Sequence, residues 1–143
     1  MHSPLGDLTL FEDEGSIVAL ESGWAGTGDG SALLARAIAA LQEYFDGAPL
    51  PGDLPLAPAG TPYQRRVWDV LRTIPHGAVL GYGAIALRAG GAGRSVGQAV
   101  GRNPIPILIP CHRVTAARGP GGYSFADGVA SKLYLLELEQ ARR

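Results

Sequence analysis

Apolar and polar residues alternate near the amino terminus in the pattern of β-strands. Leu8, Thr9 and Leu10 form one alternating stretch, and residues 17–20 form a second, apolar one. The polar residues 14–16 separate the two stretches, so the sequence predicts a β-hairpin. A hairpin alone is marginally stable in water, and this one therefore needs a covering element.

The apolar residues that follow recur at helical spacing and predict that cover. Ser31 can cap the amino end of the helix with its hydroxyl, and Gly47 can end it. The apolar positions of this predicted helix are Leu34, Ala37, Ile38, Leu41, Tyr44 and Phe45.

Residues 47–60 are rich in proline and glycine, a composition typical of an extended linker. We place a domain boundary within this segment. The sequence thus predicts a small acidic α/β domain over residues 1–56 and a second, basic domain over residues 57–143.

The second domain is predicted to be mostly helical. Thr61 and Pro62 form a cap followed by proline at the first helical position. The apolar stripe of this first helix comprises Val67, Val70, Leu71 and Ile74, and Pro75 and Gly77 are expected to stop it.

Two short helices are predicted over residues 83–89 and 94–101, joined by the glycine-rich turn 90–93. Such a pair in a basic segment suits a helix-turn-helix. A last helix is predicted from about residue 128, with Lys132, Leu136 and Glu139 on one face. The expected fold class is α+β: a hairpin and helix, then a mainly helical domain with a helix-turn-helix of winged-helix type.

Charge is divided unevenly between the two predicted domains. The net charge of the chain is −1, but residues 1–56 hold one basic and nine acidic residues, whereas residues 57–143 hold eleven basic and four acidic ones. Ten of those eleven cations are arginine, whose planar fork suits phosphate. The imbalance indicates a polyanion partner for the second domain, although solvated helix faces would give the same composition.

The sequence contains a single cysteine, Cys111, and three histidines, so neither an internal disulfide nor a metal cluster is predicted. We expect no metal and no cofactor. With 46% hydrophobic residues, 17% charged residues and no run of eighteen apolar residues, we expect a soluble cytoplasmic protein with no membrane partner.

Cys111 is either a small buried hydrophobe or a reactive thiol. A thiol becomes nucleophilic when it loses its proton, and a nearby base or cation lowers its pKa. His112 and Arg113 follow Cys111 directly, and Glu139 could orient the imidazole as a carboxylate does in acyl-transfer triads. Adjacent side chains point apart, so we expect His112 to reach the sulfur through a water.

The segment around Cys111 reads Asn103-Pro104-Ile105-Pro106-Ile107-Leu108-Ile109-Pro110-Cys111-His112-Arg113-Val114. This run resembles the active-site signature of the O6-alkylguanine-DNA alkyltransferases, and the similarity covers nearly all of residues 60–139. The amino-terminal Ser3-Pro4-Leu5-Gly6-Asp7-Leu8 and Tyr44-Phe45-Asp46-Gly47 resemble the family's smaller domain.

The resemblance implies a DNA repair enzyme that works once. It would flip a nucleotide out of the duplex and transfer an alkyl group irreversibly from O6 of guanine, and possibly from O4 of thymine, to Cys111. The partner would be double-stranded DNA carrying O6-alkylguanine, and the protein would act as a monomer.

The resemblance also assigns roles to residues. Cys111 would accept the alkyl group, His112 would act as base, Glu139 would fix its tautomer, and Asn103 would tie the recognition helix to the active-site turn. The remaining assignments concern substrate or DNA: Tyr82 (guanine ring and phosphate), Arg94 (insertion into the duplex), Val114 (backbone carbonyl to the purine), Ser124 (O6), Lys132 (support behind the site), Tyr123 and Arg113.

The sequence departs from the family pattern in three places. Gly81 stands where serine or threonine is usual, and the turn between the two short helices is about two residues short. The segment 124–127 is about two residues longer and bulkier than usual, in a loop that would line the alkyl pocket.

Three rival functions are considered. A damage sensor would bind alkylguanine without repairing it, but such relatives lack the cysteine. A helix-turn-helix transcription regulator should bind as a dimer, and no dimer seam is evident in the short helices. A cysteine hydrolase would need an oxyanion hole, for which no motif is present.

Overall fold

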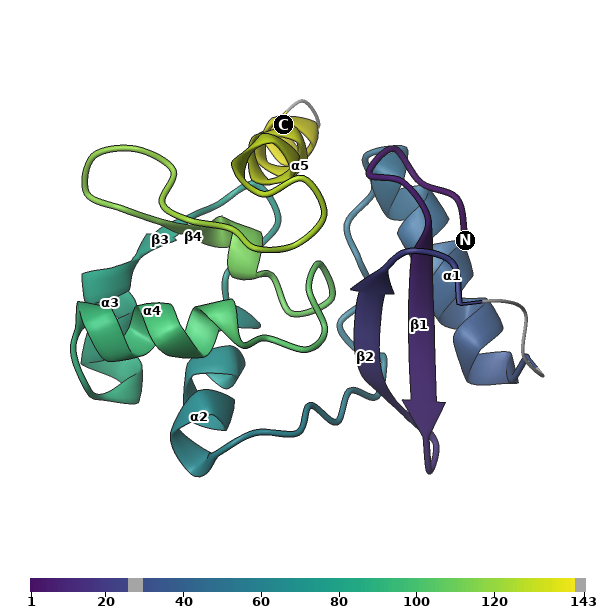
Figure 1. Ribbon diagram of the computed structural model, residues 1–143, viewed down its shortest axis with the longest axis horizontal. Helices are drawn as coiled ribbons and strands as arrows, with labels where there is room; N and C mark the ends of the chain where they lie inside the picture. The colour runs from purple at the N-terminus through teal and green to yellow at the C-terminus, as the bar shows by residue number, and fades with distance from the viewer. Residues whose placement is uncertain (26–29, 141–143) are drawn as a thin grey trace.

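A computed structural model of the chain describes residues 1–25 and 30–140 (Figure 1). The fold is α+β, as predicted. A β-hairpin with one helix forms the amino-terminal part, and helices connected by loops form the carboxy-terminal part.

The hairpin consists of β1 (Leu8–Asp13) and β2 (Ser16–Ser22), paired antiparallel. Glu14 and Gly15 have φ of 48° and 80°, the positive values that a tight hairpin turn requires. The predicted hairpin is thus confirmed.

Helix α1 (Ala32–Phe45) packs against both strands and fully buries Ala37, Leu41 and Tyr44 of its apolar stripe. The hydroxyl of Ser31 accepts a hydrogen bond from the backbone N–H of Leu34, as expected of the cap. Gly47 follows the helix with φ of 102°, a conformation in which glycine meets no steric penalty. The predicted bounds of this helix are confirmed.

The segment between α1 and the next helix is irregular but partly packed. The N–H of Ile17 donates to the carbonyl of Pro55, and the N–H of Ala57 donates to the carbonyl of Ile17, each at 2.9 Å. Leu54 is buried. The segment therefore pairs briefly with β2 on the hairpin. The domain boundary that we place within it stays a prediction.

Helix α2 (Pro62–Leu71) begins with a reciprocal capping box between Thr61 and Gln64. It ends at Leu71, so the predicted continuation to Ile74 is wrong. The hydroxyl of Thr73 bonds the carbonyl of Val70 at 2.6 Å, and the residue before Pro75 is disfavoured in helical conformation.

Helices α3 (Tyr82–Ala89) and α4 (Gly93–Gly101) each start one residue before the predicted position, and both pack on α2. The indole N–H of Trp68 donates to the carbonyl of Ala99 at 2.9 Å, which anchors α2 to α4. The function of α3 and α4 as a helix-turn-helix stays a prediction.

The 3-10 turn η1 (Cys111–Arg113) follows α4 along the chain, between the other helices and the last one, α5 (Val129–Gln140). Two very short strands, β3 (Leu80–Gly81) and β4 (Val114–Thr115), pair in parallel next to η1. Within residues 1–25 and 30–140, no helix combines the length and apolar character needed to cross a membrane.

We predict that Gly91→Ala destabilises the protein by about 1–3 kcal/mol. Gly91 lies in the α3–α4 turn with φ of 82°, and an added Cβ would stand 2.4 Å from Ser95 Oγ and 2.5 Å from the Tyr63 hydroxyl. Thermal unfolding measures the loss. The control is Gly83→Ala in α3, where nothing lies within 4 Å and φ is not positive. If the two variants have the same stability, the strain assigned to the turn is wrong.

Candidate functional site

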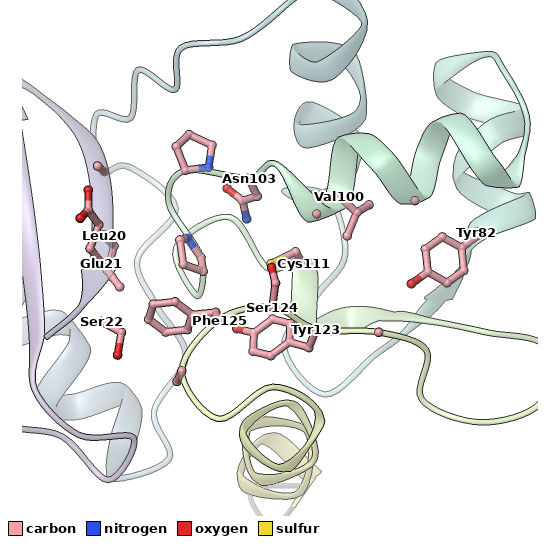
Figure 2. A pocket seen from close by; sticks show the side chains of 17 residues that line it. Leu20, Glu21, Ser22, Tyr82, Val100, Asn103, Cys111, Tyr123, Ser124 and Phe125 are labelled. Carbon is pink, nitrogen blue, oxygen red and sulfur yellow. The ribbon is translucent and has the colours of Figure 1, made fainter.

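Cys111 lies at the base of a pocket of about 720 Å³ formed by both parts of the chain (Figure 2). Its side chain is 5% exposed, yet it contributes to the pocket wall. One end of the pocket is formed by residues 19–22 of β2, and the other end by Tyr82. The sequence-predicted residues that line it are Tyr82, Asn103, Cys111, Tyr123 and Ser124.

Asn103 holds the turn that carries Cys111. Its amide nitrogen donates to the carbonyl of Ile109 at 2.8 Å, and its amide oxygen accepts from the N–H of Ile105 at 2.9 Å. Ile107, between these two, has φ of 71°, which is unfavourable for a β-branched residue. The two bonds of Asn103 help to maintain this strained turn, and so fix where the sulfur lies.

A cluster of buried polar side chains lies behind Cys111 and converges on Glu139. Oε2 of Glu139 is 2.6 Å from Nε2 of His112, and Oε1 accepts from Nε of Arg113 at 2.9 Å. Further donors to the carboxylate are Nη2 of Arg113 at 3.0 Å, the N–H of Gly77 at 3.2 Å and the hydroxyl of Tyr44 at 2.6 Å.

The protonation states within this cluster follow from burial and hydrogen bonding. Burial disfavours the charged form of Glu139, but hydrogen bonds from His112 and Arg113 outweigh it and hold the pKa of the carboxyl well below its usual range. Burial lowers the pKa of His112, although Glu139 works in the opposite direction. At neutral pH the carboxylate is therefore ionised and the imidazole is neutral.

These states determine the tautomer of His112. An ionised carboxylate only accepts hydrogen bonds, so Nε2 of His112 carries the proton and Nδ1 carries the lone pair. Nδ1 is buried and has no hydrogen-bond partner among the described residues. His112 thus has the free basic nitrogen that a general base next to Cys111 requires.

The thiol itself does not have the lowered pKa that the sequence led us to expect. Burial raises the pKa of Cys111 to about 11, even though Asn103, Lys132 and Tyr123 work in the opposite direction. The neighbouring cation Arg113 is paired with Glu139, and its charge is not directed at the sulfur. At neutral pH the thiol is therefore protonated.

Lys132 and Val114 lie behind the pocket wall. Nζ of Lys132 donates to the carbonyl of Val114 and, at 3.0 Å, to the carbonyl of Gly122. Both side chains are fully buried. Lys132 thus joins β4 to the loop before Tyr123, consistent with the support that was expected of it.

Arg113 does not lie where a residue contacting DNA or substrate would. It is 7% exposed, binds both oxygens of Glu139, and donates from Nη1 to the carbonyl of Ile74 at 2.7 Å. The expectation that it touches DNA is wrong, because all of these contacts face the interior. Arg94, by contrast, is exposed at the second residue of α4.

Two contributors to the site were not named among the predicted site residues, although the loop of one of them was expected to line the pocket. Phe125 packs edge-on to Tyr123, with ring centroids 6.3 Å apart, and lines the pocket in the loop of unusual length. Tyr44 was assigned only to an apolar stripe, yet its hydroxyl reaches Glu139 from α1. A buried tyrosine hydroxyl needs a partner, which is the one signal in the sequence that could have identified it.

Comparison with known proteins gives matches over both parts of the chain. A family model described as 6-O-methylguanine DNA methyltransferase, DNA binding domain, matches residues 62–141. A second, described as the ribonuclease-like domain of the same family, matches residues 1–58.

Individual relatives agree with this result. The chain is 40% identical over 146 residues to a methylated-DNA–protein-cysteine methyltransferase of Methanothermobacter thermautotrophicus, covering 97% of this chain and 82% of the relative. It is 39% identical over 150 residues to the protein of that name from Mycobacterium leprae, covering 98% and 90%. Among solved structures, Mycobacterium tuberculosis OGT in complex with DNA is similar, with a TM-score of 0.84 and 37% identity over 99% of this chain and 92% of that one.

We predict that the DNA-free protein reacts slowly with iodoacetamide at neutral pH and that the rate rises about tenfold per pH unit up to about pH 10. Only the thiolate reacts, and a pKa near 11 keeps the thiolate fraction proportional to hydroxide over this range. Mass spectrometry of the labelled protein gives the rate, and Cys111 is the only cysteine. Circular dichroism checks that the fold persists. A rate that levels off below about pH 9, as for an ordinary thiol, contradicts the raised pKa.

Proposed function

The chain belongs to the 6-O-methylguanine DNA methyltransferase family, and from this premise we propose that it repairs DNA by transferring an alkyl group from O6 of guanine to its own Cys111. One observation carries the proposal for the site: the only sulfur nucleophile of the chain lines a pocket of about 720 Å³, with a neutral histidine next to it. A pocket of this size suits a small organic ligand such as a nucleobase.

The substrate has to leave the duplex to react. The alkyl carbon on O6 is stacked between base pairs, so sulfur can attack it in line only after the nucleotide has been flipped out. In the pocket, Tyr82 would contact the purine from one end, and Ser124 would face O6. The backbone carbonyl of Val114 would accept a hydrogen bond from the purine in addition to the one from Lys132, because a carbonyl has two lone pairs.

The proton of the thiol leaves through His112. It passes by way of a water to Nδ1, while Nε2–H remains bonded to Glu139. The sulfur–carbon bond forms as the carbon–oxygen bond breaks, and the bonding pair departs with guanine. Guanine takes up one proton from solvent, and His112 returns the proton of the thiol to solvent, so the protons balance. The Tyr82 hydroxyl can donate a hydrogen bond to the charge that develops on guanine.

The raised pKa of Cys111 is compatible with this chemistry. A thiolate of high pKa is intrinsically more nucleophilic than one of low pKa, so activation at the moment of transfer yields a strong nucleophile. The product is a thioether, and none of the side chains of the site can reverse its formation. Each molecule therefore acts once.

DNA would approach along the helical part of the chain. Arg94 lies at the exposed start of α4, the helix whose Gly97 and Val100 line the pocket. A side chain inserted there could fill the space that the flipped base leaves and so offset part of the unstacking cost. Phosphates would be held by exposed arginines of the basic half, among the described residues Arg65, Arg66, Arg72, Arg88, Arg102 and Arg118.

We predict that incubation with a duplex containing O6-methylguanine adds one methyl group to the protein. Intact-mass analysis should give full conversion at equimolar lesion, with the added mass on the Cys111 peptide. Cys111→Ala should show no added mass and still bind the duplex. An unmodified wild-type protein that binds the methylated duplex would contradict the proposal and favour a damage sensor.

We further predict that Arg94→Ala slows transfer from duplex DNA by about tenfold or more. Flipping the nucleotide costs a few kcal/mol, and the variant lacks the inserted side chain that offsets part of this cost. Transfer from the free alkylated base should change by less than about twofold, since no flipping is involved. Arg36→Ala, which removes an exposed arginine from α1 in the amino-terminal part, is the charge-matched control. Equal slowing for duplex and free base would exclude the inserted role of Arg94.

A further inference from the structure

Tyr44 comes from the amino-terminal part of the chain, but its hydroxyl lies within the polar cluster behind Cys111. It is fully buried near the end of α1. The hydroxyl donates to Oε2 of Glu139 at 2.6 Å and lies 3.4 Å from Nε2 of His112. Of the side chains bound to this carboxylate among the described residues, Tyr44 alone comes from residues 1–56.

The position of the phenol is closely constrained. Its ring packs edge-on to Phe45, with centroids 5.5 Å apart, and edge-on to His76, with centroids 6.0 Å apart. Burial and the adjacent Glu139 raise the pKa of Tyr44 far above its usual value, so the hydroxyl keeps its proton. Tyr44 is therefore a permanent donor with little freedom to turn away.

Oε2 of Glu139 is shared between Tyr44, His112 and Nη2 of Arg113. Each donor withdraws negative charge from this oxygen and restricts its direction. Because the imidazole is bound to the same oxygen, the phenol influences both the orientation of His112 and the strength of its bond to the carboxylate.

We propose that Tyr44 is a positioning residue for alkyl transfer: its phenol holds Oε2 of Glu139 against Nε2 of His112, so that the amino-terminal part completes the proton relay of the carboxy-terminal part. This inference rests on the proposed function. It gives the amino-terminal part, otherwise a wall of the pocket, a role in the reaction itself.

The charged and titratable groups around His112 determine in which direction its pKa should change when the Tyr44 hydroxyl is removed. They are Glu139 and Lys132 on α5, Arg113 on η1, and Tyr44 on α1. Loss of the phenol hydroxyl leaves more negative charge on Oε2, which favours protonation of the imidazole. Removal of Tyr44's hydroxyl should thus raise the pKa of His112, whereas an indirect effect on folding would leave it unchanged.

The experiment compares Tyr44→Phe with wild type in single-turnover transfer from methylated duplex across about pH 5 to 9. The variant should be about three- to tenfold slower near neutral pH, the effect of losing one charge-assisted hydrogen bond. Its duplex affinity should match that of wild type. The acid limb of its pH profile should lie at higher pH, because His112 is protonated more readily.

Two control variants separate positioning from packing. Tyr134→Phe removes a hydroxyl from an exposed position of α5 and should leave the rate and the pH profile unchanged. Phe45→Leu alters the packing of the Tyr44 ring without touching Glu139; it should lower the melting temperature while the pH profile stays in place. NMR titration of the imidazole of His112 in the DNA-free protein gives a readout independent of transfer, and its midpoint should rise only in Tyr44→Phe.

The outcomes are distinct. A Tyr44→Phe protein that matches wild type in rate and in His112 midpoint overturns the inference, and so does a slower one whose pH profile and midpoint are unshifted. If Tyr44→Phe does not fold, Tyr44 is replaced by 3-fluorotyrosine, which keeps the ring and makes the hydroxyl a stronger donor to Glu139. The His112 midpoint should then fall, and an unchanged midpoint would overturn the inference. A wild-type protein that transfers no alkyl group overturns the proposed function, which is separable from failure of the inference alone.

Discussion

An ionised carboxylate in the interior has to be surrounded by donors, and the donors of Glu139 come from widely separated parts of the chain. They are Tyr44 on α1, Gly77 in the loop after α2, and His112 and Arg113 on η1. Removing one partner of a buried charge costs about 3–5 kcal/mol. The four elements that carry Glu139 and its donors are therefore held in one position relative to one another. The position of Cys111, next to His112 in η1, depends on that arrangement.

The cluster also explains how a basic half can contain a neutral histidine next to Cys111. Arg113 is the cation that balances Glu139, so the imidazole does not have to become charged to satisfy the carboxylate. His112 then remains available to accept a proton, and Glu139 can stabilise it once it has done so. If the arginine at this position faced DNA, His112 would be the only counter-ion of Glu139. The imidazole would then be protonated at rest and could not accept a proton.

Features that depend on local sequence could be predicted, whereas those that depend on distant packing could not. The hairpin, the caps at Ser31 and Thr61, and the bounds of α1 follow from periodicity and side-chain chemistry within a few residues. Tyr44 and Glu139 are 95 positions apart, and nothing in the local pattern of either indicates that they meet. The interior position of Arg113 could not be predicted for the same reason: the resemblance placed it with the DNA- or substrate-contacting residues, but its partner Glu139 is 26 positions away.

A buried, protonated thiol suits a protein that reacts only once. Oxidants and small electrophiles attack the thiolate, so a thiol with a pKa near 11 is poorly reactive toward them at neutral pH. If the thiolate persisted at rest, each chance reaction would consume a molecule without repairing a lesion. Keeping His112 neutral, with Nδ1 available, and deprotonating Cys111 only when the pocket is filled would therefore reserve the one reaction of each molecule for its substrate. By this argument, the burial that makes the resting sulfur unreactive is a requirement of single-turnover chemistry and does not conflict with it.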